Sequence, residues 1–259
     1  MTQSVDPLSV DGTRIVVTGG VSGIGHAIAL GLAERGARVA VLDLPGARLE
    51  EAGRKAAETG LELTYHGVDV SDEDAVEAGF DAALAALGGI DVVFANAGIA
   101  GTVKPVTDWT LQEWRQVISV NLDGAFLTAR AALRRMDHVL GKKLIFTASV
   151  WGQRGSTTAQ CAGYSASKNG VIGLTKQLAA DLAAVQVTVN AIAPSGFVTD
   201  IAGGMMRDET ATAPMLARQP WHRFVEPTEA VGPAVFLSSR ASDHVTGHVL
   251  ALEGGYLAV

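Results

Sequence analysis

The sequence lacks several features that would assign it to other classes of protein. Cys161 is the only cysteine among 259 residues, so no intramolecular disulfide can form, and we expect a cytoplasmic protein. No apolar run reaches the roughly 20 residues of a membrane-spanning helix, and the start, MTQSVDPLSVDG, has no secretory signal pattern. The net charge of −7, with no run of lysine or arginine, argues against a nucleic-acid partner.

Metal-ligand spacing and interdomain linkers are absent as well. The six histidines show no spacing typical of metal ligands, so we expect no metal site. No Pro-, Gly- or Ser-rich linker divides the chain, which predicts one domain over residues 1–259 with an N-terminal tail over 1–11. Apolar residues make up 48% and charged residues 18%, as is typical of a compact domain with a substantial core.

Short apolar runs alternate with segments of helical periodicity along most of the chain. The runs are continuous in Val, Ile, Leu and Ala, as expected for parallel strands that are buried on both faces. The pattern therefore predicts an α/β fold with a doubly wound parallel sheet. We expect strands at 14–19, 38–43, 61–70, 91–98, 143–149, 187–194 and 248–255, and helices at 24–35, 46–58, 72–87, 110–137, 163–184 and 227–239.

One stretch, residues 196–221, shows no clear period. It contains Gly203, Gly204, Pro214 and Pro220. A long segment of this kind in a compact domain is either a loop that covers a substrate or a passive surface loop, and we favour the first interpretation.

The segment TGGVSGIGHAIA (18–29) follows the first strand and opens a helix. Gly19, Gly23 and Gly25 allow a tight turn and close approach of the backbone to a pyrophosphate, whose charge the helix N-terminus favours. Glycines also end strands for purely structural reasons, but here the strand before and the helix after supply the context of a dinucleotide site. We expect Ser22 and Ile24 to take part in this cofactor site.

Asp43 ends the second strand, 18 residues after Gly25. An acidic side chain at this place accepts hydrogen bonds from the adenosine ribose and repels a 2′-phosphate, so it favours NAD; the alternative is an aspartate that only initiates a turn. Arg48 is expected on the solvent side of the next helix. The ends of the second, third and fourth strands supply the further cofactor contacts that we expect: Leu44, Asp69, Val70, Asn96, Ala97 and Gly98.

Residues 164–170 read YSASKNG, with Tyr164 and Lys168 one helical turn apart on the same face. With the Gly-rich turn, the NAG at 96–98 and Ser149, this chain resembles the classical short-chain dehydrogenase/reductase family over about residues 10–257. The resemblance implies a Rossmann-type domain with a seven-stranded sheet, assembled as a homotetramer. It also implies that Asn121, Ser149, Tyr164 and Lys168 are catalytic.

Three departures from the family pattern are visible. Ala95–Asn96 replaces the usual pair of asparagines, and Pro194-Ser195-Gly196 replaces Pro-Gly after the sixth strand. The segment between Ser149 and Tyr164 is two residues longer than the common spacing. The first two departures change little, whereas the third alters a wall of the substrate pocket.

The residue types fit an alcohol–ketone reaction. A tyrosine has a pKa near 10, and Lys168 together with a positive nicotinamide would lower that of Tyr164 so that it acts as the base. Ser149 would hold the substrate oxygen. Asn121, a polar residue inside a long helix, would hold a water that links Lys168 to solvent. Lys168 would also bind the nicotinamide ribose.

Residues near the nicotinamide and substrate come from several segments. On the nicotinamide side we expect Pro194, Gly196, Val198 and Thr199, together with Tyr164 and Lys168. For the substrate we expect Ser149, Trp151, Gln153 and Tyr164, and name as further candidates Arg154, Gln160, Met205, Met206, Trp221 and His222.

Two reactive residue types near these segments have simpler explanations. Cys161 has no histidine near it in sequence, and a buried small thiol is preferred to a nucleophile. His26 follows the Gly-rich turn, and we expect it on the surface of the helix.

These observations predict an NAD-dependent oxidoreductase that interconverts a secondary alcohol and a ketone. Gln and Arg in the 150–162 segment favour a small polar substrate, such as a sugar acid, polyol or hydroxy acid. The C-terminal segments look closest to gluconate and deoxygluconate dehydrogenases. A 3-oxoacyl-thioester reductase is the alternative enzyme, and a catalytically silent cofactor sensor is the alternative of another class.

Overall fold

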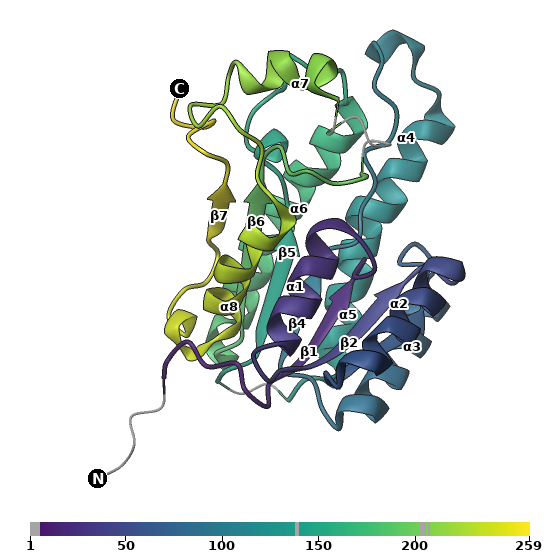
Figure 1. The fold of residues 1–259 in the computed structure, drawn as a ribbon, viewed down its shortest axis with the longest axis vertical. Helices are drawn as coiled ribbons and strands as arrows, with labels where there is room; N and C mark the ends of the chain where they lie inside the picture. Colours follow the sequence, from purple (N-terminus) through teal and green to yellow (C-terminus); the bar gives the residue numbers. More distant parts are fainter. Residues whose placement is uncertain (1–5, 138–139, 202–205, 207) are drawn as a thin grey trace.

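The computed structural model describes residues 6–137, 140–201, 206 and 208–259. Its centre is one parallel sheet in the order β3-β2-β1-β4-β5-β6-β7 (Figure 1). The direction of winding reverses between β1 and β4, and a parallel sheet has its ligand crevice outside the carboxyl ends of the strands at such a point. The strands are β1 (Arg14–Thr18), β2 (Arg38–Asp43), β3 (Leu63–Gly67), β4 (Val92–Ala95), β5 (Lys143–Thr147), β6 (Thr188–Pro194) and β7 (Val249–Leu252).

Helices cover both faces of this sheet. Side chains of the central strands alternate between two apolar clusters, as the two-residue period of a strand requires. One cluster joins the sheet to α3, α5 and α6, and the other joins it to α1 and α8. The helices are α1 (Gly23–Ala33), α2 (Ala47–Thr59), α3 (Glu73–Leu87), α4 (Leu111–Ile118), α5 (Gly124–Arg135), α6 (Ala162–Leu182), α7 (Glu209–Leu216) and α8 (Val231–Ser238).

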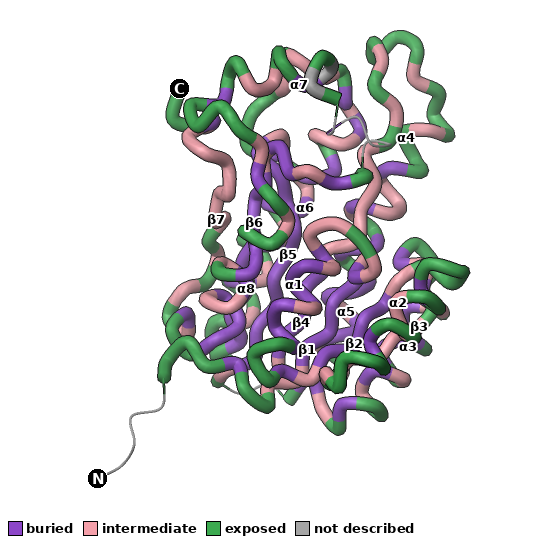
Figure 2. The backbone as a smooth tube through the Cα atoms, viewed as in Figure 1, coloured by how far each residue is buried: buried purple, intermediate pink, exposed green. Residues whose placement is uncertain are grey.

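The interior strands are almost fully buried, whereas the outer sides of the helices are exposed (Figure 2). All residues of β4, β5 and β6 are buried, which explains why their sequences are continuous apolar runs. The predicted α/β, doubly wound, single-domain fold with seven strands is therefore confirmed. Val10, which we assigned to the N-terminal tail, is buried against the α1 side of the sheet.

Two expected elements differ from the structure. The helix expected at 110–137 consists of α4, a π-helical turn over Ser119–Asp123 and α5. The aperiodic stretch 196–221 contains α7, which includes Pro214. Gly203, Gly204 and Met205 lie outside the described residues.

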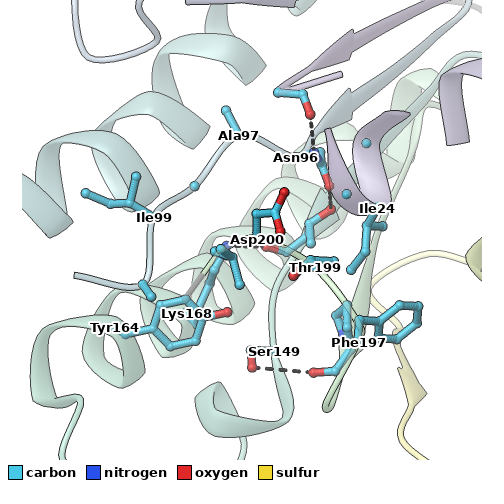
Figure 3. A pocket seen from close by; sticks show the side chains of 18 of the residues that line it. Ile24, Asn96, Ala97, Ile99, Ser149, Tyr164, Lys168, Phe197, Thr199 and Asp200 are labelled. Carbon is cyan, nitrogen blue, oxygen red and sulfur yellow. Dashed lines mark hydrogen bonds between the residues drawn. The ribbon is translucent and has the colours of Figure 1, made fainter. Parts of the chain in front are cut away.

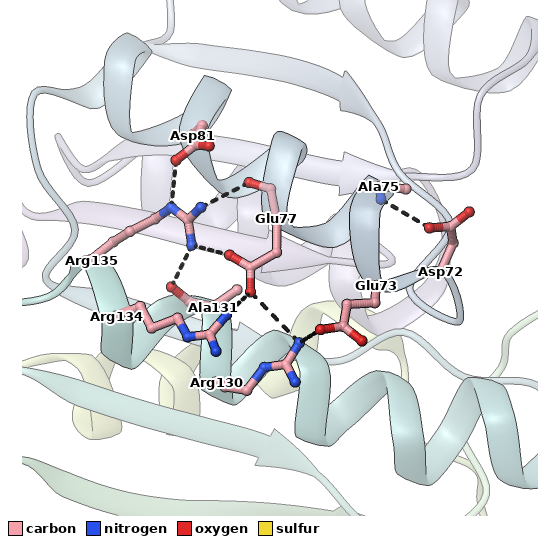
Figure 4. Close-up of polar contacts among 9 residues, drawn as sticks. All are labelled: Asp72, Glu73, Ala75, Glu77, Asp81, Arg130, Ala131, Arg134 and Arg135. Atoms are coloured by element: carbon pink, nitrogen blue, oxygen red, sulfur yellow. Dashed lines mark hydrogen bonds and ion pairs between the residues drawn. The ribbon is translucent and has the colours of Figure 1, made fainter.

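A ladder of ion pairs connects α3 to α5 (Figure 4). Glu77 of α3 pairs with Arg134 and Arg135 of α5, and Arg135 also binds Asp81. Arg135 is the more buried arginine, with 12% of its side chain exposed, and it donates further hydrogen bonds to backbone carbonyls. The ladder borders the apolar contact of these helices and holds α5, which follows the π-helical turn, against the sheet.

Candidate functional site

A pocket of about 570 Å³ lies at the carboxyl edge of the sheet, at the point where the winding reverses. It is lined by the residues that follow β1 to β6, with additions from α6, α7 and the C-terminal segment. Figure 3 shows Tyr164, Lys168 and Ser149 on one side of this pocket, and Asn96, Ala97 and Ile24 further along it. Residues from distant parts of the chain therefore meet here.

The Gly-rich turn has no room for side chains. Gly19 has φ of +69°, and a Cβ there would lie 2.7 Å from the Cα of Ala97. A Cβ on Gly25 would lie 2.1 Å from the carbonyl oxygen of Gly19. The backbone consequently turns sharply into α1, whose first residue is Gly23. This bare helix N-terminus fits the pyrophosphate of a dinucleotide.

The Asn96 side chain is hydrogen-bonded to the Gly-rich turn and is therefore held in one position at the pocket. Its Nδ2 donates to the carbonyl oxygens of Thr18 and Gly19, both at 3.1 Å. Its Oδ1 accepts a hydrogen bond of 3.0 Å from Thr147 Oγ1. One asparagine thus ties the end of β4 to the turn after β1 and to the end of β5, and this role explains why a polar side chain follows a buried strand.

Asp43, the last residue of β2, lines one end of the pocket. Its carboxylate accepts hydrogen bonds from the backbone N–H of Val21 at 2.9 Å and of Leu44 at 2.8 Å, so its position is fixed. Asp69 also lines this end and is held by Ser71. Arg48, which we expected on the solvent side of its helix, is exposed and also lines the pocket.

Tyr164 and Lys168 lie one turn apart on α6, with the Lys168 Nζ 5.7 Å from the centre of the tyrosine ring. The Lys168 Nζ donates to the carbonyl oxygen of Thr147 at 2.7 Å and is almost fully buried. Ser149 is the N-cap of a short 3₁₀ turn, and its Oγ lies 3.4 Å from the carbonyl oxygen of Pro194. The Trp151 ring meets the Tyr164 ring edge-on, with centroids 6.0 Å apart.

Burial changes the acidity of both groups. Desolvation raises the pKa of the Tyr164 phenol to about 12, although a hydrogen bond with Ser149 acts in the opposite direction. Desolvation also lowers the pKa of the Lys168 ammonium to about 8. The lowered pKa that we expect for Tyr164 depends on the positive nicotinamide as well as on Lys168; in the protein alone, desolvation outweighs the hydrogen bond with Ser149.

Asn121 lies in the π-helical turn and is 1% exposed. Its Oδ1 accepts a 2.8 Å hydrogen bond from the N–H of Ile99, and its Nδ2 donates to the Ile99 carbonyl and to Ser167 Oγ. Ser167 in turn donates to the carbonyl of Tyr164. The side chain therefore connects the end of β4 to α6 and does not line the pocket.

Most of the predicted site residues meet in this pocket, and three do not. Asn121 lies behind it, Val198 is half-buried and pairs through its N–H with Val225, and Gln153 is exposed outside it. Those that line it are Gly19, Ser22, Gly23, Ile24, Gly25, Asp43, Leu44, Asp69, Val70, Asn96, Ala97, Gly98, Ser149, Trp151, Tyr164, Lys168, Pro194, Gly196 and Thr199.

The further candidates for substrate contact differ in whether they line the pocket. Met206 lines the pocket, but Arg154, Gln160, Trp221 and His222 do not. Cys161 is buried at its edge, which agrees with a packed thiol, and desolvation raises its pKa.

His26 is half-buried rather than on the surface. Six further lining residues were not named individually from the sequence: Ile99, Thr147, Met215, Gln219, Phe224 and Tyr256. Of these, Met215 and Gln219 lie in the aperiodic stretch 196–221 that we expected to cover a substrate.

Two other kinds of feature are absent from the described part of the chain. No helix there is long and apolar enough to cross a membrane. No three His, Cys, Asp or Glu side chains are grouped there as metal ligands would be.

The fold and this pocket are those of a Rossmann-type nucleotide-binding protein. Residues 19–257 match a sequence family described as "Enoyl-(Acyl carrier protein) reductase". The chain belongs to the short-chain dehydrogenase/reductase family, whose members act on CH–OH groups.

Characterised relatives resemble this chain over nearly its whole length. It is 40% identical over 244 residues to the cis-4-hydroxycyclohexanecarboxylate dehydrogenase of Sinomonas cyclohexanicum, covering 94% of this chain and 96% of that protein. It is 36% identical over 252 residues to the 5-keto-D-gluconate 5-reductase of Escherichia coli K12, covering 97% and 98%. The structure of a gluconate 5-dehydrogenase from Burkholderia cenocepacia, in complex with NADP and tartrate, superposes with a TM-score of 0.89 at 32% identity, covering 98% of both chains.

Proposed function

We propose that this protein is an NAD-dependent oxidoreductase in which Tyr164 transfers the proton between a secondary alcohol and a ketone. The observation that carries the proposal is the meeting of Tyr164, Lys168 and Ser149 at the carboxyl edge of the sheet, beside the Gly-rich turn. When bound, the nicotinamide nucleotide accepts or supplies the hydride. The protein contributes the binding, the orientation and the proton transfer.

The proton chemistry follows from the two shifted groups. Ser149 holds the substrate oxygen next to the Tyr164 hydroxyl, which accepts the proton during oxidation and donates it during reduction. Lys168, with a pKa of about 8, exchanges a proton close to neutral pH and lies over the tyrosine ring. The positive charge of Lys168 would stabilise a phenolate at Tyr164 and so offset part of the cost of its desolvation.

Asp43 supports NAD as the cofactor, since its fixed carboxylate lies where a ribose is expected and would repel a 2′-phosphate. A second candidate is NADP, which Arg48 favours because it lines the same end of the pocket. The Burkholderia relative contains NADP. Steady-state rates with each nucleotide at several concentrations distinguish the two.

The relatives support two kinds of small-molecule substrate. The similarity to the 5-keto-D-gluconate 5-reductase supports a sugar acid as the substrate. A sugar acid is one of the three substrate classes expected from the sequence, the others being polyols and hydroxy acids. The cis-4-hydroxycyclohexanecarboxylate dehydrogenase supports a hydroxyl group on a saturated ring. We further propose a homotetramer that acts in the cytoplasm, for which the family resemblance and the single cysteine are the support.

Substitution of Tyr164 tests the proposal directly. Tyr164→Phe is expected to reduce turnover by about 10²- to 10⁴-fold, the usual contribution of a positioned acid or base, while NADH still binds in a fluorescence titration. Tyr65→Phe is the matched control, because Tyr65 is a half-buried tyrosine of β3 outside the pocket. Turnover that survives in Tyr164→Phe would show that another group transfers the proton.

A further inference from the structure

The part of the pocket around Tyr164, here called the substrate half, has mainly apolar walls. They come from the turn after β5, from the segment around α7 and from the C-terminal segment. A Cβ on Gly196 would lie 2.3 Å from the Phe224 ring and 3.3 Å from Met206 Cε, so both side chains cover the end of β6. The apolar and aromatic walls are Trp151, Ile201, Met206, Met215, Phe224 and Tyr256.

Two polar side chains of the substrate half, Gln219 and Thr158, already have protein partners, whereas the buried Ser195 hydroxyl directly after β6 has none among the described residues. Gln219 is 2% exposed, and its Nε2 donates to the carbonyl oxygen of Arg223 at 2.7 Å. The Thr158 hydroxyl lies 3.3 Å from the Ser156 hydroxyl. Neither group is an isolated donor or acceptor waiting for a ligand. Hydroxyl groups of a polyol that were desolvated here would lose water without gaining equal hydrogen bonds.

The charges in the substrate half do not favour an anion. Apart from Lys168, whose Nζ is bound to Thr147, the charged side chain that lines it among the described residues is Asp200. Gln153, Arg154 and Gln160, which made this region polar in the sequence, are exposed outside the pocket. Arg154 instead binds the carbonyl oxygens of the C-terminal segment.

From these walls we infer that the substrate is a compact, neutral secondary alcohol with an apolar body of ring size, such as a substituted cyclohexanol. The reacting hydroxyl meets Ser149 and Tyr164, and the ring packs against the aromatic and thioether groups. A saturated ring also loses fewer rotatable bonds on binding than an open chain of equal size. The inference rests on the proposed function, because it assumes that Tyr164 marks the reacting carbon.

A comparison of three alcohols tests the inference: cyclohexanol, xylitol and gluconate, each oxidised with NAD and followed by NADH absorbance. We expect kcat/KM for cyclohexanol to exceed the other two by about tenfold or more, as apolar pockets discriminate through burial of methylene groups. A higher kcat/KM for xylitol or gluconate would overturn the inference. The same ranking should appear with NADP if that nucleotide is the better cofactor.

Two variants on α7 test whether the apolar wall of the substrate half causes the preference for cyclohexanol over xylitol. Met215→Gln replaces a lining thioether with an amide of similar size and should reduce the ratio of cyclohexanol to xylitol kcat/KM by about fivefold or more. Leu216→Gln is the matched control, since Leu216 is its neighbour on the helix and does not line the pocket. Equal ratios in wild type and Met215→Gln would contradict the assigned wall.

A binding measurement separates failure of this inference from failure of the proposed function. If no alcohol is oxidised with either nucleotide, the proposed function fails. Calorimetric titration of cyclohexanol and xylitol into the Tyr164→Phe protein with NAD then still decides the substrate class. Tighter binding of cyclohexanol supports the apolar substrate, and tighter binding of xylitol overturns it.

Discussion

Asp43 and Arg48 lie at the same end of the pocket and favour different nucleotides. Asp43→Asn retains an acceptor for the Val21 N–H but removes the negative charge. We expect this variant to lower the ratio of NAD to NADP kcat/KM by about tenfold, which corresponds to about 1.4 kcal/mol of repulsion removed. Arg48→Ala should raise that ratio if Arg48 contacts a 2′-phosphate. An unchanged ratio in Asp43→Asn would show that the discrimination lies elsewhere.

Lys168, which we propose to be catalytic, also has a cost in stability. Below pH 8 this lysine is charged in both the folded and the unfolded protein, and the folded state bears the full desolvation cost. Its pKa falls from about 10.5 to about 8 on folding, which corresponds to about 3 kcal/mol. Between pH 8 and 10.5 the unfolded state binds more protons, so the free energy of unfolding rises with pH through this window.

Lys168→Met should therefore stabilise the protein at pH 7 while it abolishes turnover. We expect a gain of about 1–2 kcal/mol in urea unfolding, less than the full shift, because the hydrogen bond to Thr147 is also lost. The gain should shrink as pH rises from 8 to 10.5. Lys143→Met is the contrast, since Lys143 is equally buried but paired with Asp243, and its loss should destabilise the protein. A Lys168→Met protein that is less stable than wild type at pH 7 would contradict the desolvation cost assigned to Lys168.

At the scale of elements, the C-terminal segment is a wall of the pocket that Arg154 holds in place. Arg154 Nη1 donates to the carbonyl oxygens of Tyr256 at 3.1 Å and Val259 at 2.7 Å. Its guanidinium also lies 5.2 Å from the centre of the Tyr256 ring. Tyr256 is 8% exposed and lines the pocket. Arg154, which lies between Ser149 and Tyr164 in the sequence, thus helps to position the segment 256–259.

Arg154→Ala should loosen this wall without touching the reacting groups. We expect KM for the alcohol to rise by about tenfold, while kcat and the NADH dissociation constant stay within about twofold, since a wall contributes equally to ground-state and transition-state binding. Arg154→Lys should restore part of the loss because it keeps one donor but not the planar stack. The control is Arg240→Ala, an exposed arginine that lines neither this pocket nor the hollow beside Arg154. A fall in kcat with unchanged KM would contradict the prediction that Arg154 acts by holding this wall of the pocket.

The π-helical turn shows why local periodicity could not predict the boundaries of every helix. The run from 110 to 137 is apolar at helical spacing, so the sequence predicts one continuous helix. Asn121 makes three hydrogen bonds, to the backbone of Ile99 and to Ser167, and these partners come from other elements. The extra residue in the turn is therefore favoured by tertiary contacts, and π-turns of this kind frequently occur at functional sites.

At the scale of the whole molecule, the sheet and the Gly-rich turn were predictable because their signals are local. A strand buried on both faces must be apolar throughout, as β4 to β6 are, and the tight turn at Gly19 requires glycine. The substrate half was not predictable in this way. Phe224 and Tyr256 reach it from segments without a motif, and the orientation of Arg154 depends on contacts with residues 256 and 259, which are distant in sequence.

We expect the protein to assemble as a homotetramer, and the exposed faces of α5 and α6 are candidates for the subunit contact. Phe126 on α5 is 46% exposed, with the Arg130 guanidinium 5.4 Å from its ring centre. The neighbouring outer face of α6 carries the small exposed residues Ala166 and Gly173, which allow another helix to approach closely. An exposed aromatic side chain beside such a face is typical of the centre of a subunit contact.

Phe126→Glu should dissociate the assembly, because a symmetric contact brings two introduced carboxylates together. Light scattering of wild type should give about four times the 26.8 kDa of one chain, and that of the variant a half or a quarter of this mass. Leu8→Glu is the matched control, since Leu8 has the same 46% exposure but lies near the N-terminus. A Phe126→Glu protein that keeps the wild-type mass would exclude α5 from the contact. A wild-type protein with the mass of one chain would show that the pocket, C-terminal wall included, is complete within a single subunit.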